Sequence, residues 1–253
     1  MKRFYYKIII ILAFIVAGSC SKTDEISLAD IPLSSSAHNN GVGASARELL
    51  DGTKRKLLIE IQYMPGYELQ QQTIRNLTTF LQTHLHKPGG IAVTQEQIPE
   101  IGADTKSLID VARIEQQYRT AFNTDDQVSV NVLVTNSRYT TNKVLGIAFR
   151  NTSVCLFGKT IQQSSGGIDQ ASRAKTESTI LNHEFGHLLG LVDLGSPMQT
   201  NHRDAAHNNH CNGATCLMEY GVQTADLLGS LVTGTIPVLD ANCRNDLRAN
   251  GGK

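Results

Sequence analysis

The chain has 253 residues, of which 40% are hydrophobic, 18% are charged and 6% are aromatic. This composition is typical of a folded globular protein and excludes wholesale disorder. Lysine plus arginine number 23 and aspartate plus glutamate number 23, so the formal net charge is zero. Because nucleic-acid binding depends on an excess of basic residues that neutralise phosphates, we expect no nucleic-acid partner.

The first twenty residues have the zones of an export signal. Residues 1–7 carry three basic side chains, residues 8–17 form an unbroken apolar run, and small residues lead to Cys20. The run is too short to span a bilayer, which takes roughly 20 apolar residues. A cysteine directly after small residues resembles the lipobox of bacterial lipoproteins, although Ala17 stands where that family usually has leucine. An incidental cysteine after an ordinary cleaved signal is the alternative.

The lipobox resemblance implies that residues 1–19 are a lipoprotein signal peptide and that Cys20 is lipidated. The exported protein would then be anchored to the outer membrane, on its periplasmic or cell-surface face. Residues 20–45 are rich in serine, asparagine, alanine and glycine, a composition typical of a flexible tether. His38 in this segment, and His84 and His86 further on, belong to no motif, and we interpret all three as surface or helix-cap residues.

Hydrophobic periodicity predicts alternating strands and helices in the first part of the folded domain. Apolar residues at every second position predict strands at 57–63 and 128–134, and residues 91–98 are a further candidate strand. Apolar residues three and four apart predict helices at 74–85 and 108–122, and short apolar runs at 145–149 and 153–157 predict a hairpin or sheet edge. This order indicates an α/β (α+β) fold, a mixed twisted sheet with helices packed on it. From Gly195 onward the periodicity is poor, which predicts an irregular C-terminal lobe.

A short motif in the next predicted helix, residues 170–189, carries the metal chemistry. His183 and His187 are four residues apart, so they lie on one face of the helix, one turn apart. Two imidazoles placed in this way can bind one Zn²⁺ at about 2.0–2.1 Å, and Glu184 beside them can act as general base on a metal-activated water. Gly190 is a natural helix end because glycine reaches the left-handed conformation without steric cost. We therefore expect one catalytic zinc ion at this motif.

The motif and its glycine, HExxHxxG, resemble those of the metzincin zinc peptidases, whose active-site helix ends there so that the chain can turn and deliver a third ligand. Residues 216–220 look like the Met-turn of that clan, with Met218 beneath the metal. Within the clan, residues 210–218 are similar to the archaemetzincin pattern of His-Cys, four residues, Cys, one residue, Met. The resemblance covers residues 175–220. It implies a metzincin-like catalytic domain over residues 46–253, with an N-lobe at about 55–190 and an irregular C-lobe with the Met-turn at about 191–253.

The resemblance leaves the third metal ligand open. Most metzincins place this ligand six residues after the second histidine, where this chain has Asp193, and snapalysins use aspartate there. Archaemetzincins place a histidine directly before the first cysteine of their pattern, which here is His210. Because imidazole is the commoner zinc ligand and the second match is longer, we favour His210 and keep Asp193 as the alternative. His202 and His207, in the insertion 193–209 that the His210 alignment requires, are further candidates.

Two more features follow from the same resemblance. Tyr220 stands where astacins and serralysins have a tyrosine that contacts zinc or the transition state, although it is equally interpretable as a core aromatic residue. Archaemetzincins hold a second, structural zinc through residues of the Cys211 and Cys216 type and a downstream Cys-x-x-Cys pair, but only Cys243 follows here. We therefore expect a Cys211–Cys216 or Cys216–Cys243 disulfide, with buried free thiols as the alternative, and we interpret Cys155 as a core residue.

These observations predict a zinc-dependent endopeptidase that hydrolyses peptide or protein substrates, with Glu184 as general base on a metal-activated water. By family analogy, the substrate would bind along the strand edge at residues 144–157. The alternative is a non-catalytic zinc-binding surface lipoprotein that serves as an adhesion or binding module, and a third possibility is a zinc hydrolase of non-peptide amides. Glu184 favours an enzyme, because a purely structural zinc site has no need of a carboxylate that handles water.

Overall fold

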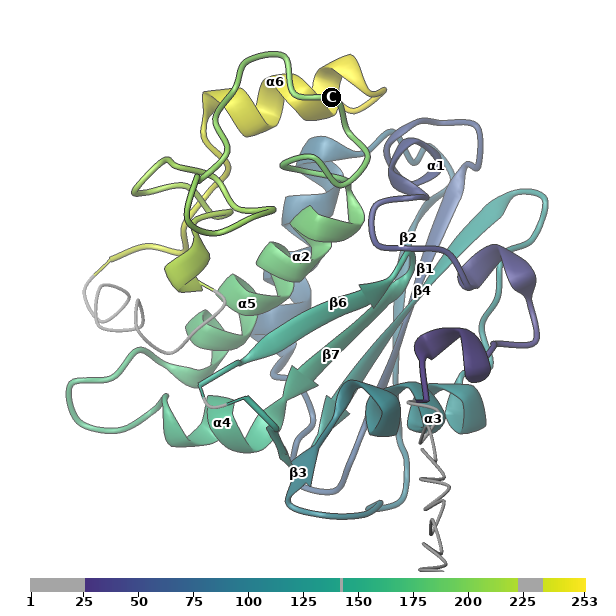
Figure 1. Cartoon of the computed structure of the whole chain (residues 1–253), viewed down its shortest axis with the longest axis vertical. Coiled ribbons are helices and arrows are strands. Elements are labelled where there is room, and N and C mark those ends of the chain that lie inside the picture. Colours follow the sequence, from purple (N-terminus) through teal and green to yellow (C-terminus); the bar gives the residue numbers. More distant parts are fainter. Residues whose placement is uncertain (1–25, 142, 223–233) are drawn as a thin grey trace, which may run out of the picture.

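The computed structural model describes residues 26–141, 143–222 and 234–253, so the predicted signal peptide and Cys20 lie outside the described residues. A five-stranded sheet forms its centre, in the order β2-β1-β4-β7-β6 (Figure 1). The strands are β1 (Lys56–Tyr63), β2 (Gly90–Gln97), β4 (Gln127–Thr135), β6 (Gly146–Arg150) and β7 (Ser153–Phe157). Strands β1, β2, β4 and β7 run parallel to one another, and β6 pairs antiparallel with β7 at the edge of the sheet. The predicted mixed sheet and its terminal hairpin are therefore confirmed.

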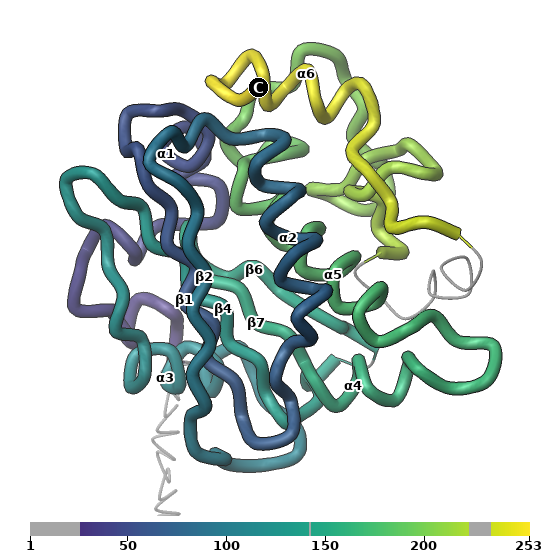
Figure 2. The backbone as a smooth tube through the Cα atoms, turned by 180° about the vertical axis from the view of Figure 1, so that it is seen from behind, coloured from purple at the N-terminus to yellow at the C-terminus, as the bar shows by residue number. Residues whose placement is uncertain are grey.

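Helices cover both faces of the sheet. Helix α2 (Gln71–His84) and helix α5 (Arg173–Leu188) lie side by side on one face, and α3 (Leu108–Tyr118) lies on the other (Figures 1 and 2). The alternation in β4 explains the two layers, because Val130 and Val132 join the core under α2 and α5 while Leu133 joins the core on the α3 side. Helix α3 is shorter than the predicted 108–122, since the backbone turns to an extended conformation at Arg119.

The remaining elements are short. They are α1 (Ala46–Leu50), β3 (Thr105–Lys106), β5 (Arg138–Tyr139), α4 (Gly158–Gln163), α6 (Ala241–Ala249) and the 3-10 turns Leu28–Asp30, Ser36–His38 and Tyr220–Val222. The C-terminal lobe is irregular over residues 195–219, as predicted, but helix α6 was not expected there. Asp240 caps this helix by accepting a hydrogen bond from the backbone N–H of Cys243 at 2.9 Å. No helix within the described ranges is long and apolar enough to cross a membrane.

The prediction of a flexible tether is wrong for residues 26–45, which pack against the sheet. Ile31 and Leu33 are 5% exposed and His38 is fully buried. The His38 ring accepts a hydrogen bond from the backbone N–H of Asn123 at 3.0 Å and lies 2.8 Å from the guanidinium of Arg119. Composition alone does not predict these polar contacts, because a serine- and asparagine-rich segment can be either a flexible linker or a segment ordered by hydrogen bonds to buried groups.

The interpretation as surface residues is wrong for His38 and also for His84, which lies in the last turn of α2. Its ring is buried at the end of α2, with its centroid 5.0 Å from that of Phe80. His86 is exposed, as expected.

Candidate metal centre

Helix α5 carries the histidine motif in its last two turns. The helix begins at Ser172, whose hydroxyl accepts a hydrogen bond from the backbone N–H of Lys175 at 3.3 Å. It ends at Gly190, which has a φ of +77°. A Cβ atom on Gly190 would lie 2.5 Å from the backbone nitrogen of Ser196 and 2.7 Å from the Cβ of Ala46. Glycine is therefore required at this helix end both by backbone conformation and by space.

Three histidines meet at one point beside α5. His183, His187 and His210 can each offer a ring nitrogen within 4.8 Å of the others, and all three are buried. The Nε2 atoms of His183 and His187 are 3.1 Å apart. The ring centroid of His210 lies 5.3 Å from that of His183 and 5.1 Å from that of His187. The helix thus provides two of the rings and the irregular C-terminal lobe provides the third.

Backbone carbonyls orient two of these rings. His183 donates from Nδ1 to the carbonyl of Leu217 at 2.7 Å, and His210 donates from Nδ1 to the carbonyl of Asn208 at 2.9 Å. Both bonds leave the Nε2 lone pair free to bind a metal, which is the usual arrangement of zinc-binding histidines. The buried Nε2 of His210 has no hydrogen-bond partner among the described residues.

The electrostatics of the group favour a metal ion over a proton. The Nε2 atoms of His183 and His187, 3.1 Å apart, can share a proton in an N–H···N hydrogen bond, and a cation bound by both nitrogens would replace that proton. Burial lowers the pKa of His183 to about 3 and holds the pKa of His187 well below its usual value, and it also lowers the pKa of His210. The three imidazoles are therefore neutral near pH 7, which is the state that binds zinc. The donor set fits one Zn²⁺ with three protein ligands and an open position.

Glu184 lies fully buried next to this group. Neither of its carboxylate oxygens has a hydrogen-bond partner among the described residues. Burial raises the pKa of Glu184 to about 8, and the nearby backbone amide of Ala148 in β6 lowers it by a smaller amount. A buried carboxyl group without hydrogen-bond partners lowers the stability of the fold. Its presence here therefore indicates that a water molecule or a substrate supplies the missing hydrogen bonds.

Met218 lies directly beneath the motif helix. It is fully buried, and its Sδ atom lies only 2.2 Å from the position that a Cβ atom would take on Gly186. Glycine at the second variable position of the motif is therefore what lets the methionine approach α5. The preceding residue, Leu217, accepts the hydrogen bond from His183, so the Met-turn also orients a ligand.

The other candidates for the third ligand lie elsewhere. Asp193 pairs with Arg203 at 3.0 Å, and its side chain is 44% exposed. The ring of His207 stacks on Tyr220, with centroids 3.9 Å apart and an interplanar angle of 7°. Tyr220 in turn packs edge-on against His210, with centroids 5.2 Å apart. The structure therefore brings Tyr220 beside the histidine group and leaves Asp193 away from it.

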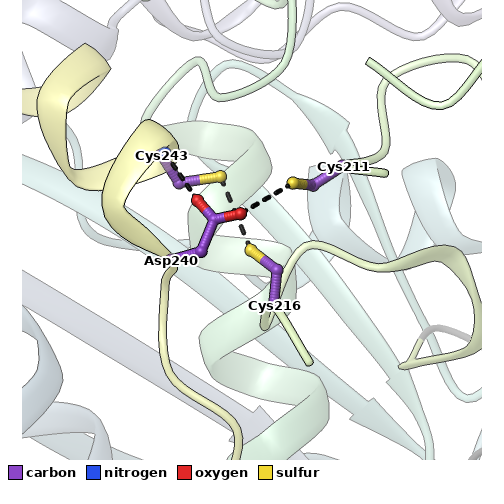
Figure 3. A group of neighbouring side chains, drawn as sticks. All are labelled: Cys211, Cys216, Asp240 and Cys243. Atoms are coloured by element: carbon purple, nitrogen blue, oxygen red, sulfur yellow. Dashed lines mark hydrogen bonds between the residues drawn. The ribbon is translucent and has the colours of Figure 1, made fainter. Parts of the chain in front are cut away.

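Cys211, Cys216, Cys243 and Asp240 form a second cluster, here called the thiolate group (Figure 3). Each residue can offer one ligand atom within 4.8 Å of the others. The Sγ atoms of Cys216 and Cys243 are 3.6 Å apart, and the thiol of Cys211 donates to the Asp240 carboxylate at 3.2 Å. The sequence analysis missed Asp240. Its position three residues before Cys243 is the signal, because it occupies the first place of a Cys-x-x-Cys spacing.

The predicted disulfides are wrong. All four described cysteines are free, and the 3.6 Å between the sulfurs of Cys216 and Cys243 far exceeds the roughly 2.05 Å of an S–S bond. The neighbouring thiols of Cys211 and Cys243 hold the pKa of Cys216 well below its usual value. Such a site, with a readily formed thiolate, suits a soft divalent metal such as zinc. Cys155 is buried in the core, as expected.

The comparisons with known proteins give a distant structural match. No family model matches the sequence, and a search of curated proteins finds no match. Among solved structures, archaemetzincin from Methanopyrus kandleri is similar to this chain, with 16% sequence identity and a TM-score of 0.46. The match covers 79% of this chain and 96% of that one. At this distance, function has to be argued from the residues of the chain itself.

Proposed function

We propose that this protein is a zinc-dependent endopeptidase of the metzincin type. One observation carries the proposal: three neutral imidazoles, two of them oriented by backbone carbonyls, surround one point beside a buried carboxylate that has no partner among the described residues. A closed structural zinc site has four protein ligands and no unused carboxylate. An open fourth position next to Glu184 is instead the arrangement of a hydrolytic centre.

The residues divide the chemical work. His183, His187 and His210 would hold a zinc ion, and such an ion would supply an acidified water molecule and a Lewis acid for the scissile carbonyl. Glu184 takes a proton from the attacking water at its carboxylate and passes it to the leaving amine nitrogen. The raised pKa of Glu184 suits a group that must take up a proton near neutral pH. Tyr220, which packs against His210, is the candidate for contact with the transition state.

The outer edge of strand β6 is the proposed binding site of the substrate. The strand pairs with β7 on one side, and its backbone passes directly beside Glu184. A Cβ atom on Gly146 in this strand would lie 3.2 Å from the Cγ atom of Glu184. An extended peptide that adds to the outer edge of β6 would therefore bring its backbone carbonyls close to the histidine group.

The location of the enzyme is a further part of the proposal. The N-terminal sequence supports export as a lipoprotein, attached to the outer membrane through lipid on Cys20 and facing the periplasm or the cell surface. Peptides or proteins in that compartment would be its substrates. Hydrolysis there requires no nucleic-acid partner, in agreement with the zero net charge of the chain.

Cleavage of a mixed peptide library, read by mass spectrometry, tests the proposal. The zinc-loaded protein without residues 1–19 should cleave, and the Glu184→Gln variant should retain zinc but lose activity by about 10²–10⁴-fold. A chelated sample serves as the second control. Cleavage by Glu184→Gln at the wild-type rate would refute the assigned mechanism. Stoichiometric zinc in the wild type without any cleavage would instead favour the non-catalytic zinc-binding lipoprotein.

A further inference from the structure

The inference concerns His202, which belongs to neither group of candidate ligands. Its side chain is 1% exposed, and its two ring nitrogens face two different partners. Nδ1 lies 3.3 Å from the Sγ atom of Cys211, and Nε2 donates to the carboxylate of Asp246 at 2.7 Å. Asp246 is itself fully buried, on helix α6. A polar pair buried this deeply has a high desolvation cost unless further hydrogen bonds satisfy its polar atoms.

The buried pair ties three segments together. The second carboxylate oxygen of Asp246 accepts a hydrogen bond from the backbone N–H of Gln199 at 2.7 Å. His202 also lies 4.0 Å from the Sγ atom of Cys243, on the same helix as Asp246. The pair therefore joins the insertion 193–209 to the thiolate group on one side and to α6 on the other. Outer partners of this kind orient metal ligands, and their loss typically costs 10–100-fold in metal affinity.

His202 also begins a short hairpin, residues 202–212, that carries His210 of the histidine group. The carbonyl of His202 accepts from the backbone N–H of Asn212 at 2.9 Å, and the N–H of Asp204 donates to the carbonyl of His210 at 2.8 Å. Between these two bonds, Arg203 and Cys211 form an antiparallel bridge. His210 and Cys211 are adjacent on the returning side of this hairpin, so one backbone segment presents a ligand to each group.

We propose that His202 is the positioning residue of a metal site formed by the thiolate group, and that a zinc ion held there fixes the hairpin 202–212 and with it His210. His202 bridges Cys211 to Asp246, which sets the direction of the Cys211 sulfur and anchors the hairpin to α6. The occupant is a soft divalent cation, because three sulfurs and one carboxylate oxygen form its surroundings. The inference rests on the proposed function only in the role that it gives to His210.

Cobalt substitution isolates the thiolate group, because only a site with sulfur ligands gives thiolate-to-cobalt charge-transfer absorption. The full protein is titrated with Co²⁺ as wild type, as His202→Gln and as Asp246→Asn. His86→Gln is the matched control, since His86 is exposed and lies in neither metal group. Hydrogen exchange of the backbone amides in residues 202–212, measured by mass spectrometry, reports on the hairpin.

Both variants of the pair should lower the Co²⁺ affinity of the thiolate group by about 10–100-fold and shift its charge-transfer band, while the control titrates as wild type. Exchange over residues 202–212 should slow when the wild type binds metal, and it should slow less in His202→Gln. A wild-type titration and wild-type exchange in His202→Gln would overturn the proposal, and so would the absence of any charge-transfer band in the wild type. Because this readout needs no peptide cleavage, an inactive wild type would refute the proposed function and leave this inference standing.

Discussion

The contact between Gly186 and Met218 gives the sharpest test of how α5, the helix that carries the histidine motif, is supported. Replacing Gly186 by alanine places a Cβ atom 2.2 Å from the Sδ atom and 3.1 Å from the Cε atom of Met218. Ordinary contact between such atoms is about 3.5–4.0 Å, so the sulfur must move by more than 1 Å. Met218 is fully buried, so a displaced side chain has to repack against the surrounding core.

The expected cost follows from two opposing effects. Overpacking of a buried site costs about 1–3 kcal/mol. Alanine in a helix interior is favoured over glycine by about 1 kcal/mol, which offsets part of that cost. The net loss in free energy of unfolding should therefore be between zero and about 2 kcal/mol. In a Met218→Ala background the clash is absent, so the same Gly186→Ala change should stabilise the protein by up to about 1 kcal/mol.

A double-mutant cycle measured by urea unfolding of the metal-free protein separates these effects. Gly41→Ala is the matched control, because a Cβ atom there would meet nothing within 4 Å and its effect should be the same in both backgrounds. Zinc affinity provides a second readout, since a displaced Met218 pulls on the Leu217 carbonyl that orients His183. An equal effect of Gly186→Ala in both backgrounds would refute the reasoning.

Three further predictions address the ligands, the pH dependence and the anchor. His210→Ala should bind one equivalent of zinc less than the wild type, measured by elemental analysis after dialysis, while Asp193→Ala binds as much as the wild type; the opposite result would make Asp193 the third ligand. The unfolded pKa of His183 is about 6.5 and the folded pKa is about 3, so the metal-free protein should lose stability as pH falls through 6.5, at about 1.4 kcal/mol per pH unit for each proton taken up on unfolding. Buried Glu184, with its pKa raised to about 8, takes up a proton in the folded state over the same range and opposes this loss, so the test is made in Glu184→Gln. A urea midpoint of that variant that stays constant between pH 7 and pH 5 would contradict the shift of His183. Cys20→Ser should abolish incorporation of labelled fatty acid in bacterial cells, and undiminished labelling would exclude Cys20 as the lipidated residue.

The sequence was most informative where a local pattern alone determines the structure. The strands around Val130 and Val132 were predictable because alternation and burial coincide, and helix α5 was predictable because its motif, its apolar residues and Gly190 agree. Residues 26–45 were mispredicted as a tether because their order depends on a few buried polar contacts, such as that of His38 with Arg119. No periodicity records such contacts.

The residues of the candidate site likewise fall into those that the sequence predicts and those that it does not. His183 and His187 are positioned by one helical turn, so their proximity follows from spacing alone. The third ligand required a choice between His210 and Asp193, because the intervening chain is irregular and its path depends on tertiary contacts. Asp240 was missed for a chemical reason, since a carboxylate in a set of cysteines breaks the pattern by which such sites are recognised.

The irregular C-terminal lobe holds its shape through contacts between the two candidate metal groups. The backbone N–H of Cys211 donates to the carbonyl of Met218 at 2.7 Å, and the N–H of Met218 donates to the sulfur of Cys216 at 3.4 Å. The nine residues 210–218 thus carry a ligand of the histidine group, two sulfurs of the thiolate group and the methionine beneath the motif. A segment with no regular secondary structure can be this well fixed only when its polar backbone groups and side chains are satisfied at both ends. The same backbone bonds fix the segment before His210, because the ladder between residues 202–204 and 210–212 closes it at the histidine group.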